Sequence, residues 1–100
     1  IEKPELEHIA PQTENPKNGY DVYDEDFRNQ YIDCLGNYLL LSKSHNCSVG
    51  NKPFTDKRDS FKHSNQQREI VDMTKDNLTW TRELIKKRNH KITKLLMRKV

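Results

Sequence analysis

The sequence predicts a small α+β domain that combines a short two-stranded sheet with several helices. Strand-like runs at residues 5–9 and 38–41 predict the sheet, and apolar residues at helical spacing predict helices between and after them. With 100 residues, the chain is long enough for one domain. We expect this domain to cover residues 1–100, with a core at about 5–63 and a helical extension at about 64–100.

A long loop separates the first expected strand from the first expected helix. Residues 5–9 alternate weakly between polar and apolar, and Pro11 ends the run. Residues 11–23 contain prolines, asparagines and a glycine, which are typical of loops. Three consecutive acidic residues then suit the positive start of a helix at about 24–35. The predicted apolar face of this helix consists of Phe27, Tyr31, Cys34 and Leu35.

The second strand is expected at residues 38–41, where four apolar residues follow a helix-ending glycine and asparagine. The polar residues 42–52 after it are expected to form a loop. Pro53 suits the first turn of the next helix, where its missing N–H costs nothing. Phe54 and Phe61 lie one heptad apart, so we expect both to face the core.

Two further helices are expected in the last third of the chain. Ser64-Asn65-Gln66-Gln67 has the pattern of a capping box and starts a helix that runs through about Met73. The last helix runs from about Thr79 to the end, with lysines and arginines on its polar faces. Its apolar stripe consists of Trp80, Leu84, Ile85, Ile92, Leu95 and Leu96.

The charge of the chain changes from acidic to basic along its length. Residues 1–33 carry nine acids and three bases, whereas residues 80–100 carry eight bases and one acid. The net charge is +3. An acidic end followed by a basic end suits a protein that holds a cation at one place and a polyanion such as DNA at another. A solvated basic helix would explain the same pattern without a ligand.

The sequence also argues against several classes of protein. Its longest apolar run, Tyr38–Leu41, is far short of the roughly 18 residues that a membrane helix needs. The N-terminus is acidic and interrupted by Pro4, unlike a secretory signal. Cys34 and Cys47 form neither a disulfide framework nor a zinc-binding pair, so we expect a reduced, cytoplasmic setting. Because the chain starts at Ile1, we expect it to be part of a longer protein.

Several polar segments contain residues that can perform chemistry. Glu7 can hold a hard divalent cation, and the neighbouring His8 can take a proton from water near neutral pH. Gly36-Asn37 precedes the second strand, and residues 44–47 (Ser-His-Asn-Cys) follow it. Lys52 begins a basic segment that includes Lys57. Taken singly, each has an ordinary explanation as a strand end, a helix cap, a turn or a solvated helix face.

The order of these segments resembles the HNH (ββα-metal, His-Me finger) nucleases. Residues 7–12 (Glu-His-Ile-Ala-Pro-Gln) are close to the Asp-His-Ile-x-Pro stretch common in that superfamily. Residues 36–46 and 50–57, followed by Trp80 with Ile85 and Arg88, narrow the resemblance to the C-terminal nuclease domain of GmrSD-type restriction proteins. The resemblance covers nearly the whole chain. It implies a DNA endonuclease domain that restricts foreign or modified DNA and is joined to an upstream NTPase domain.

The resemblance also implies a role for each matching residue. His8 corresponds to the general base, and Asn37 to the asparagine that braces the loop and orients that base. Glu7 and Asn46 correspond to the metal ligands, and His45 replaces Asn46 if the register shifts by one. Basic residues of the family correspond to Lys52 and Lys57, which we expect to contact DNA phosphates. We add the run Lys86, Lys87 and Arg88 in the basic last helix.

The chemistry of phosphodiester hydrolysis agrees with these roles. Hydrolysis needs an activated water, neutralisation of phosphate charge and help for the leaving oxygen. Two protein ligands suffice for Mg²⁺ or Mn²⁺, because such ions keep several waters and take other ligands from phosphate. A site with so few ligands suits structural zinc poorly, since zinc prefers four.

Two other interpretations remain open at the level of sequence. The chain could be a non-catalytic basic module that holds DNA without cutting it. It could also be an interaction domain stabilised by zinc, with His8, His45, Cys47 and His63 as ligands, although no two of these have zinc-finger spacing.

Overall fold

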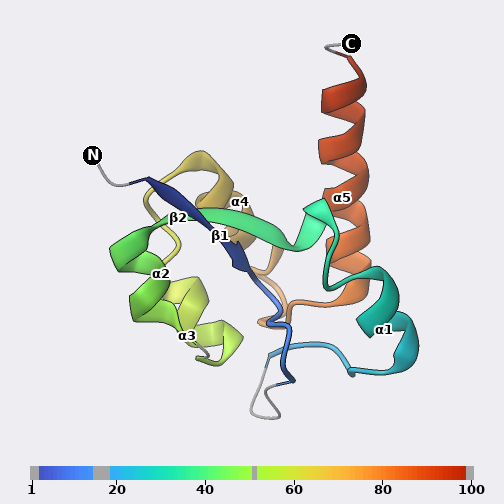
Figure 1. Ribbon diagram of the computed structural model, residues 1–100, viewed down its shortest axis with the longest axis horizontal. Coiled ribbons are helices and arrows are strands. Elements are labelled where there is room, and N and C mark those ends of the chain that lie inside the picture. Colours follow the sequence, from blue (N-terminus) through green and yellow to red (C-terminus); the bar gives the residue numbers. More distant parts are fainter. Residues whose placement is uncertain (1–2, 15–18, 51, 99–100) are drawn as a thin grey trace.

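The computed structural model describes residues 3–14, 19–50 and 52–98. Within these residues the chain forms two strands, five α-helices and one 3-10 helix (Figure 1). Strands β1 (Pro4–His8) and β2 (Tyr38–Ser42) pair in antiparallel register, with His8 opposite Tyr38. This confirms the predicted α+β class and its two-stranded sheet.

The connection between the two strands contains α1 (Glu25–Gln30) and the 3-10 helix η1 (Leu35–Asn37). The Asp24 side chain accepts a hydrogen bond from the Phe27 N–H and so caps α1, as its acidic start predicted. The predicted helix at 24–35 was too long, because α1 ends at Gln30. Of its expected apolar face, Phe27 is in the core and Tyr31 and Cys34 pack against the core as predicted, whereas Leu35 is 42% exposed.

The segment after β2 differs from the prediction. The expected loop at residues 42–52 contains the helix α2 (Lys43–Val49), which the Ser42 side chain caps by accepting from the His45 N–H. Only Val49 of this helix is buried, so its sequence has no apolar period to signal a helix. The next helix, α3 (Phe54–Asp59), begins directly after Pro53 as predicted.

Helices α4 (Asn65–Met73) and α5 (Arg82–Met97) complete the chain as expected. Ser64 caps α4 through the Gln67 N–H, and Gln67 reaches back to the His63 N–H, which is close to the predicted capping box. Figure 1 shows the C-terminal half of α5 extending beyond the rest of the molecule. Within the described segments, no helix is long and apolar enough to cross a membrane.

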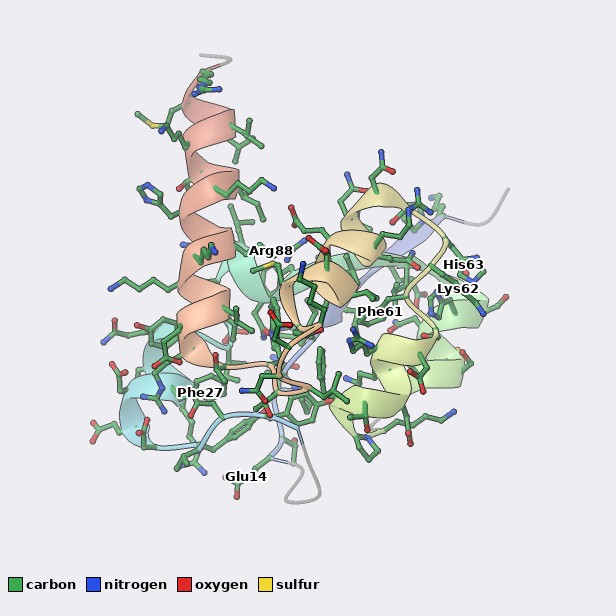
Figure 2. All side chains as sticks on the ribbon, turned by 180° about the vertical axis from the view of Figure 1, so that it is seen from behind. Glu14, Phe27, Phe61, Lys62, His63 and Arg88 are labelled. Carbon is green, nitrogen blue, oxygen red and sulfur yellow. The ribbon has the colours of Figure 1, made fainter. Side chains whose placement is uncertain are left out.

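One apolar core joins residues from all parts of the chain. Trp80 is fully buried and stacks on Phe54, with ring centroids 6.0 Å apart. Figure 2 shows Phe27 on α1 and Phe61 after α3 at the two sides of this core. Phe54 and Phe61 therefore face the core as predicted. Of the predicted stripe on the last helix, Trp80 and Ile85 are fully buried, whereas Leu95 and Leu96 are about half exposed.

Gly36 allows α5 to pack directly against η1. A Cβ atom at this position would collide with the Ile85 carbonyl oxygen and with Asn89. The close approach is fixed by a hydrogen bond from the Gly36 N–H to Asn89 Oδ1, 2.9 Å long. The glycine therefore serves close packing between helices, in addition to preceding the second strand.

Candidate active site

Glu7 and His8 lie at the end of β1 and point to opposite faces of the sheet. Successive side chains of a strand alternate between its two faces. On one face Glu7 contacts Lys57 of α3, and on the other His8 contacts Asp33 and Tyr38. His8 is the last residue of the first strand, as predicted. Glu7 and His8 are therefore close because they are neighbours in the strand, although their side chains lie on different faces of the sheet.

The Glu7 carboxylate is buried beside a buried ammonium group. Its side chain is 12% exposed, that of Lys57 is fully buried, and Oε2 lies 3.3 Å from Nζ. Apart from this contact with the Lys57 ammonium, the buried Glu7 Oε2 has no hydrogen-bond partner among the described residues. Burial raises the pKa of Glu7, and the charge of Lys57 opposes that rise.

Lys57 therefore has a different role from the expected contact with a DNA phosphate. Its Nζ donates to the Ile9 carbonyl at 3.2 Å and, more weakly, to the His8 carbonyl at 3.5 Å. Burial lowers the pKa of Lys57, and the Glu7 carboxylate opposes that effect. A fully buried ammonium cannot reach a phosphate, so this expectation was wrong. Lys57 instead fastens α3 to the end of β1.

The His8 ring is oriented by Asp33 rather than by the expected Asn37. His8 Nε2 lies 2.8 Å from Asp33 Oδ1, and the ring meets that of Tyr38 edge-on, with centroids 4.9 Å apart. A carboxylate only accepts hydrogen bonds, so Nε2 carries the proton in this pair. The remaining nitrogen, Nδ1, is then the one with a lone pair that can take a proton.

Asn37 is buried completely and braces the loop that follows β1. Its Oδ1 accepts from the Ala10 N–H at 2.9 Å and from the Trp80 indole N–H at 3.0 Å. Its Nδ2 donates to the carbonyls of Ala10 and Ile32, both at 2.9 Å. The Asn37 carbonyl also accepts from the Ile9 N–H. The side chain therefore fixes the backbone directly after His8 and acts on the imidazole only through that backbone.

Asn46 and His45 face different parts of the molecule, although both are on α2. Asn46 Nδ2 donates to Glu5 Oε1 of β1 at 2.9 Å, so Asn46 lies over the face of the sheet that carries Glu7. His45 Nε2 instead contacts Ser60 Oγ, 2.7 Å away, after α3. Burial and the nearby His63 lower the pKa of His45. Geometry thus favours Asn46 over His45 as a partner of Glu7.

The expected DNA contacts fall into two groups. Lys52, Lys86 and Lys87 are exposed. Arg88, in contrast, is 4% exposed and lies between α5 and the rest of the molecule (Figure 2). Its guanidinium donates to the carbonyls of Gly36 and Tyr38 and pairs with a carboxylate of α4. The prediction of Arg88 as a phosphate contact was therefore wrong, since its donors serve the fold.

Two residues of this region were missed by the sequence analysis. Glu5 is two positions before Glu7, and the period of a strand places both on one face, so that signal was present. Asp33 gave no such signal, because it fell inside the helix predicted at 24–35, and nothing in that helix indicated a contact with His8. The early end of α1 brings Asp33 to His8.

The donor groups on the face of Glu7 fit a hard divalent cation. Glu7 Oε2 is a buried carboxylate oxygen whose neighbour is the Lys57 ammonium, and Asn46 can offer an amide oxygen from the adjoining helix. Oxygen donors of this kind are those that Mg²⁺ and Mn²⁺ prefer. Among the described residues, no three His, Cys, Asp or Glu side chains are arranged to hold a metal ion, and His45 and His63 approach each other without a third such group.

A small α+β domain that presents a carboxylate, an imidazole and a carboxamide near one strand end has the groups needed for hydrolysis. A family model described as the C-terminal domain of GmrSD restriction endonucleases matches residues 1–95, so the chain belongs to that family. Membership indicates a function related to restriction endonucleases, and hence DNA as the substrate. No curated protein and no solved structure gives a significant match to the chain.

Proposed function

We propose that this domain is a metal-dependent DNA endonuclease that cuts phosphodiester bonds by the HNH mechanism. The observation that carries the proposal is the strand end itself, where Glu7 and the oriented imidazole of His8 are adjacent and Asn37 fixes the loop behind them. A module that only binds DNA has no need of such a pair.

Side chains from both faces of the two-stranded sheet can act on a single phosphate at the end of β1. Because β1 pairs only with β2 within the described segments, its other edge carries no neighbouring strand. A DNA backbone that crosses the end of β1 can meet His8, whose side chain is 20% exposed, whereas Glu7, with a side chain 12% exposed, acts on it through the bound cation. We therefore place the scissile phosphate at this strand end.

His8 is the proposed general base. Asp33 keeps the proton on Nε2, so Nδ1 is free to take a proton from the attacking water. Asn37 holds the following loop and thereby the position of His8 relative to the phosphate. Proton transfer by a positioned side chain of this kind contributes about 10²- to 10⁴-fold to a rate.

Glu7 and Asn46 would hold the cation, Mg²⁺ or Mn²⁺. When bound, such an ion neutralises phosphate charge and assists departure of the 3′ oxygen. The chain's own contribution is to present two oxygen donors from a strand and a helix that already contact each other through Glu5.

In this proposal Lys52, Lys86 and Lys87 contact the DNA backbone, and the domain works in the cytoplasm beside an upstream NTPase domain that restricts foreign or modified DNA. The test is incubation of the protein with supercoiled plasmid in Mg²⁺ or in excess EDTA. We expect nicked or linear DNA in Mg²⁺ only. Tight binding without any cleavage in Mg²⁺ or Mn²⁺ would instead support the alternative of a non-catalytic basic DNA-binding module.

A further inference from the structure

The contact between Glu5 and Asn46 connects β1 to α2 across 41 positions of the sequence. Asn46 Nδ2 donates to Glu5 Oε1 at 2.9 Å in a part-buried environment. Glu5 and Glu7 lie on the same face of β1, about 6.6 Å apart along the strand. Resting on the function proposed above, we infer that Glu5 is a positioning residue that turns the Asn46 carboxamide so that its oxygen faces the cation.

The two ends of the Asn46 carboxamide differ in what they can bind. Nδ2 only donates hydrogen bonds, whereas Oδ1 only accepts them or binds a cation. Since a carboxylate only accepts, Glu5 can hold only the Nδ2 end. The Oδ1 end is thereby directed away from Glu5, and among the described residues none donates a hydrogen bond to it. An amide turned the other way would point N–H groups at the cation and repel it.

Glu5 has two competing roles that the same variants can distinguish. If Glu5 were itself a metal ligand, its carboxylate charge would be required. If it only tied α2 to β1, its loss would lower stability without changing metal affinity. A positioning residue needs an acceptor oxygen at Oε1 but not the charge, so glutamine should replace glutamate and leucine should not.

The experiment is titration of the free protein with Mn²⁺, followed by electron paramagnetic resonance, in the absence of DNA. For Glu5→Gln we expect a loss of Mn²⁺ affinity of about eightfold, the effect of removing one charge about 6.6 Å from a divalent cation in water. For Glu5→Leu, which removes the hydrogen-bond acceptor as well as the charge, we expect a further loss of about 10- to 100-fold, the usual effect of losing an outer-shell partner. Glu83→Gln, on the exposed start of α5, is the matched charge control and should bind like wild type.

A double-mutant cycle with Asn46→Ala makes the test specific. If Glu5 acts through Asn46, then Glu5→Leu should weaken Mn²⁺ binding no more than Glu5→Gln once Asn46 is alanine, because only the effect of the lost charge remains. Thermal melting without metal shows which variants are folded. If Glu5→Gln binds Mn²⁺ as weakly as Glu5→Leu and both lose far more than about eightfold, Glu5 is a direct ligand and the positioning role is overturned. If folded Glu5→Leu loses no more than the roughly eightfold effect of the charge, Glu5 is only a structural tie and the positioning role is again overturned.

Failure of this inference can be separated from failure of the proposed function. Wild-type protein that cuts plasmid in Mg²⁺ but binds no Mn²⁺ without DNA overturns a site preset by Glu5 and leaves the nuclease proposal standing. Wild-type protein that binds Mn²⁺, with Glu5→Leu no weaker than Glu5→Gln, also overturns this inference and leaves the nuclease proposal standing. Protein that neither binds Mn²⁺ nor cuts DNA overturns both.

Discussion

Lys57 Nζ lies 3.3 Å from Glu7 Oε2, and this ion pair connects the proposed metal ligand to the interior of the domain. Both shifts in pKa have burial as their largest cause, which disfavours the charged form of each group. Each charge partly offsets the cost of burying the other. The pair should therefore behave as a unit in which neither member tolerates the loss of its partner.

The first prediction concerns that unit. Lys57→Met should destabilise the domain by about 3 to 5 kcal/mol, because it leaves a buried carboxylate unpaired, and Glu7→Gln should act similarly by leaving a buried ammonium. The double variant Glu7→Gln/Lys57→Met should be clearly more stable than the sum of the two losses. Urea unfolding of the four proteins measures this. Strictly additive losses would show that the two groups do not interact.

The second prediction concerns pH. Arg82 pairs with Asp21, Asp24 and Asp26 and so holds the loop before α1 against α5. Although burial alone would raise the pKa of Asp21, hydrogen bonds from Arg82 hold it below its ordinary value. Hydrogen bonds from the Phe27 backbone and Arg82 likewise lower the pKa of Asp24. When the pKa of a carboxyl group is lower in the folded than in the unfolded protein, ionisation stabilises the fold at any pH above the unfolded pKa, which is near 3.8 for aspartate. This stability is lost as the pH falls through the folded pKa.

Wild-type protein should therefore lose stability as the pH falls below about 4, and Arg82→Leu should lose less over that range. At neutral pH Arg82→Leu should cost about 1 to 2 kcal/mol, mainly from its contacts with Asp21. Arg28→Ala is the control, because Arg28 and Glu14 are half exposed and 3.6 Å apart, and it should cost under about 1 kcal/mol. Equal acid sensitivity of wild type and Arg82→Leu, measured by thermal melting, would contradict this account.

The two-stranded sheet and the core positions Phe54, Phe61 and Trp80 could be predicted from sequence, because apolar spacing reports them directly. Helix α2 could not, since six of its seven residues are outside the core and no period marks it. Lys57 was misassigned to DNA because it matches a basic position of the family, and Arg88 because it lies in a run of basic residues in the last helix.

A signal for both cations was nevertheless present. Lys57 lies three positions after Phe54 and four before Phe61, and Arg88 lies three positions after Ile85. These are positions on the apolar face of a helix. What the sequence could not supply is the set of distant carbonyl groups that make their burial tolerable, from Ile9 for Lys57 and from Gly36 and Tyr38 for Arg88.

The third prediction concerns DNA binding. Affinity should fall steeply with salt, because contacts to phosphates release counterions. Lys86→Gln/Lys87→Gln should lower the slope of log affinity against log salt by about 0.9 for each contact removed. Lys75→Gln, an exposed lysine after α4, is the matched control and should leave the slope unchanged. Fluorescence anisotropy with labelled duplex DNA measures the slopes. Binding that is flat between low and moderate salt would rule out the phosphate contacts.

The fourth prediction separates Asn46 from its neighbour. Asn46→Ala should raise the Mg²⁺ concentration at which cleavage is half maximal, and excess Mg²⁺ should partly restore the rate. Glu7→Ala should do the same at a temperature at which thermal melting shows it to be folded, since it also leaves Lys57 unpaired. His45→Ala should change that concentration little, since His45 faces Ser60 and not β1. Cleavage rate against metal concentration for the three variants is the measurement. If His45→Ala is the damaging change and Asn46→Ala is silent, the ligand assignment is wrong by one position.

The fifth prediction tests His8 as the general base. The measurement is the plasmid cleavage rate of His8→Ala in saturating Mg²⁺, together with its DNA affinity under the same conditions. His8 acts on water in the transition state and need not contact DNA before it, so binding should remain nearly intact. The rate should fall by about 10²- to 10⁴-fold. A folded His8→Ala protein that cuts as fast as wild type would contradict the assignment of this strand end as a nuclease site.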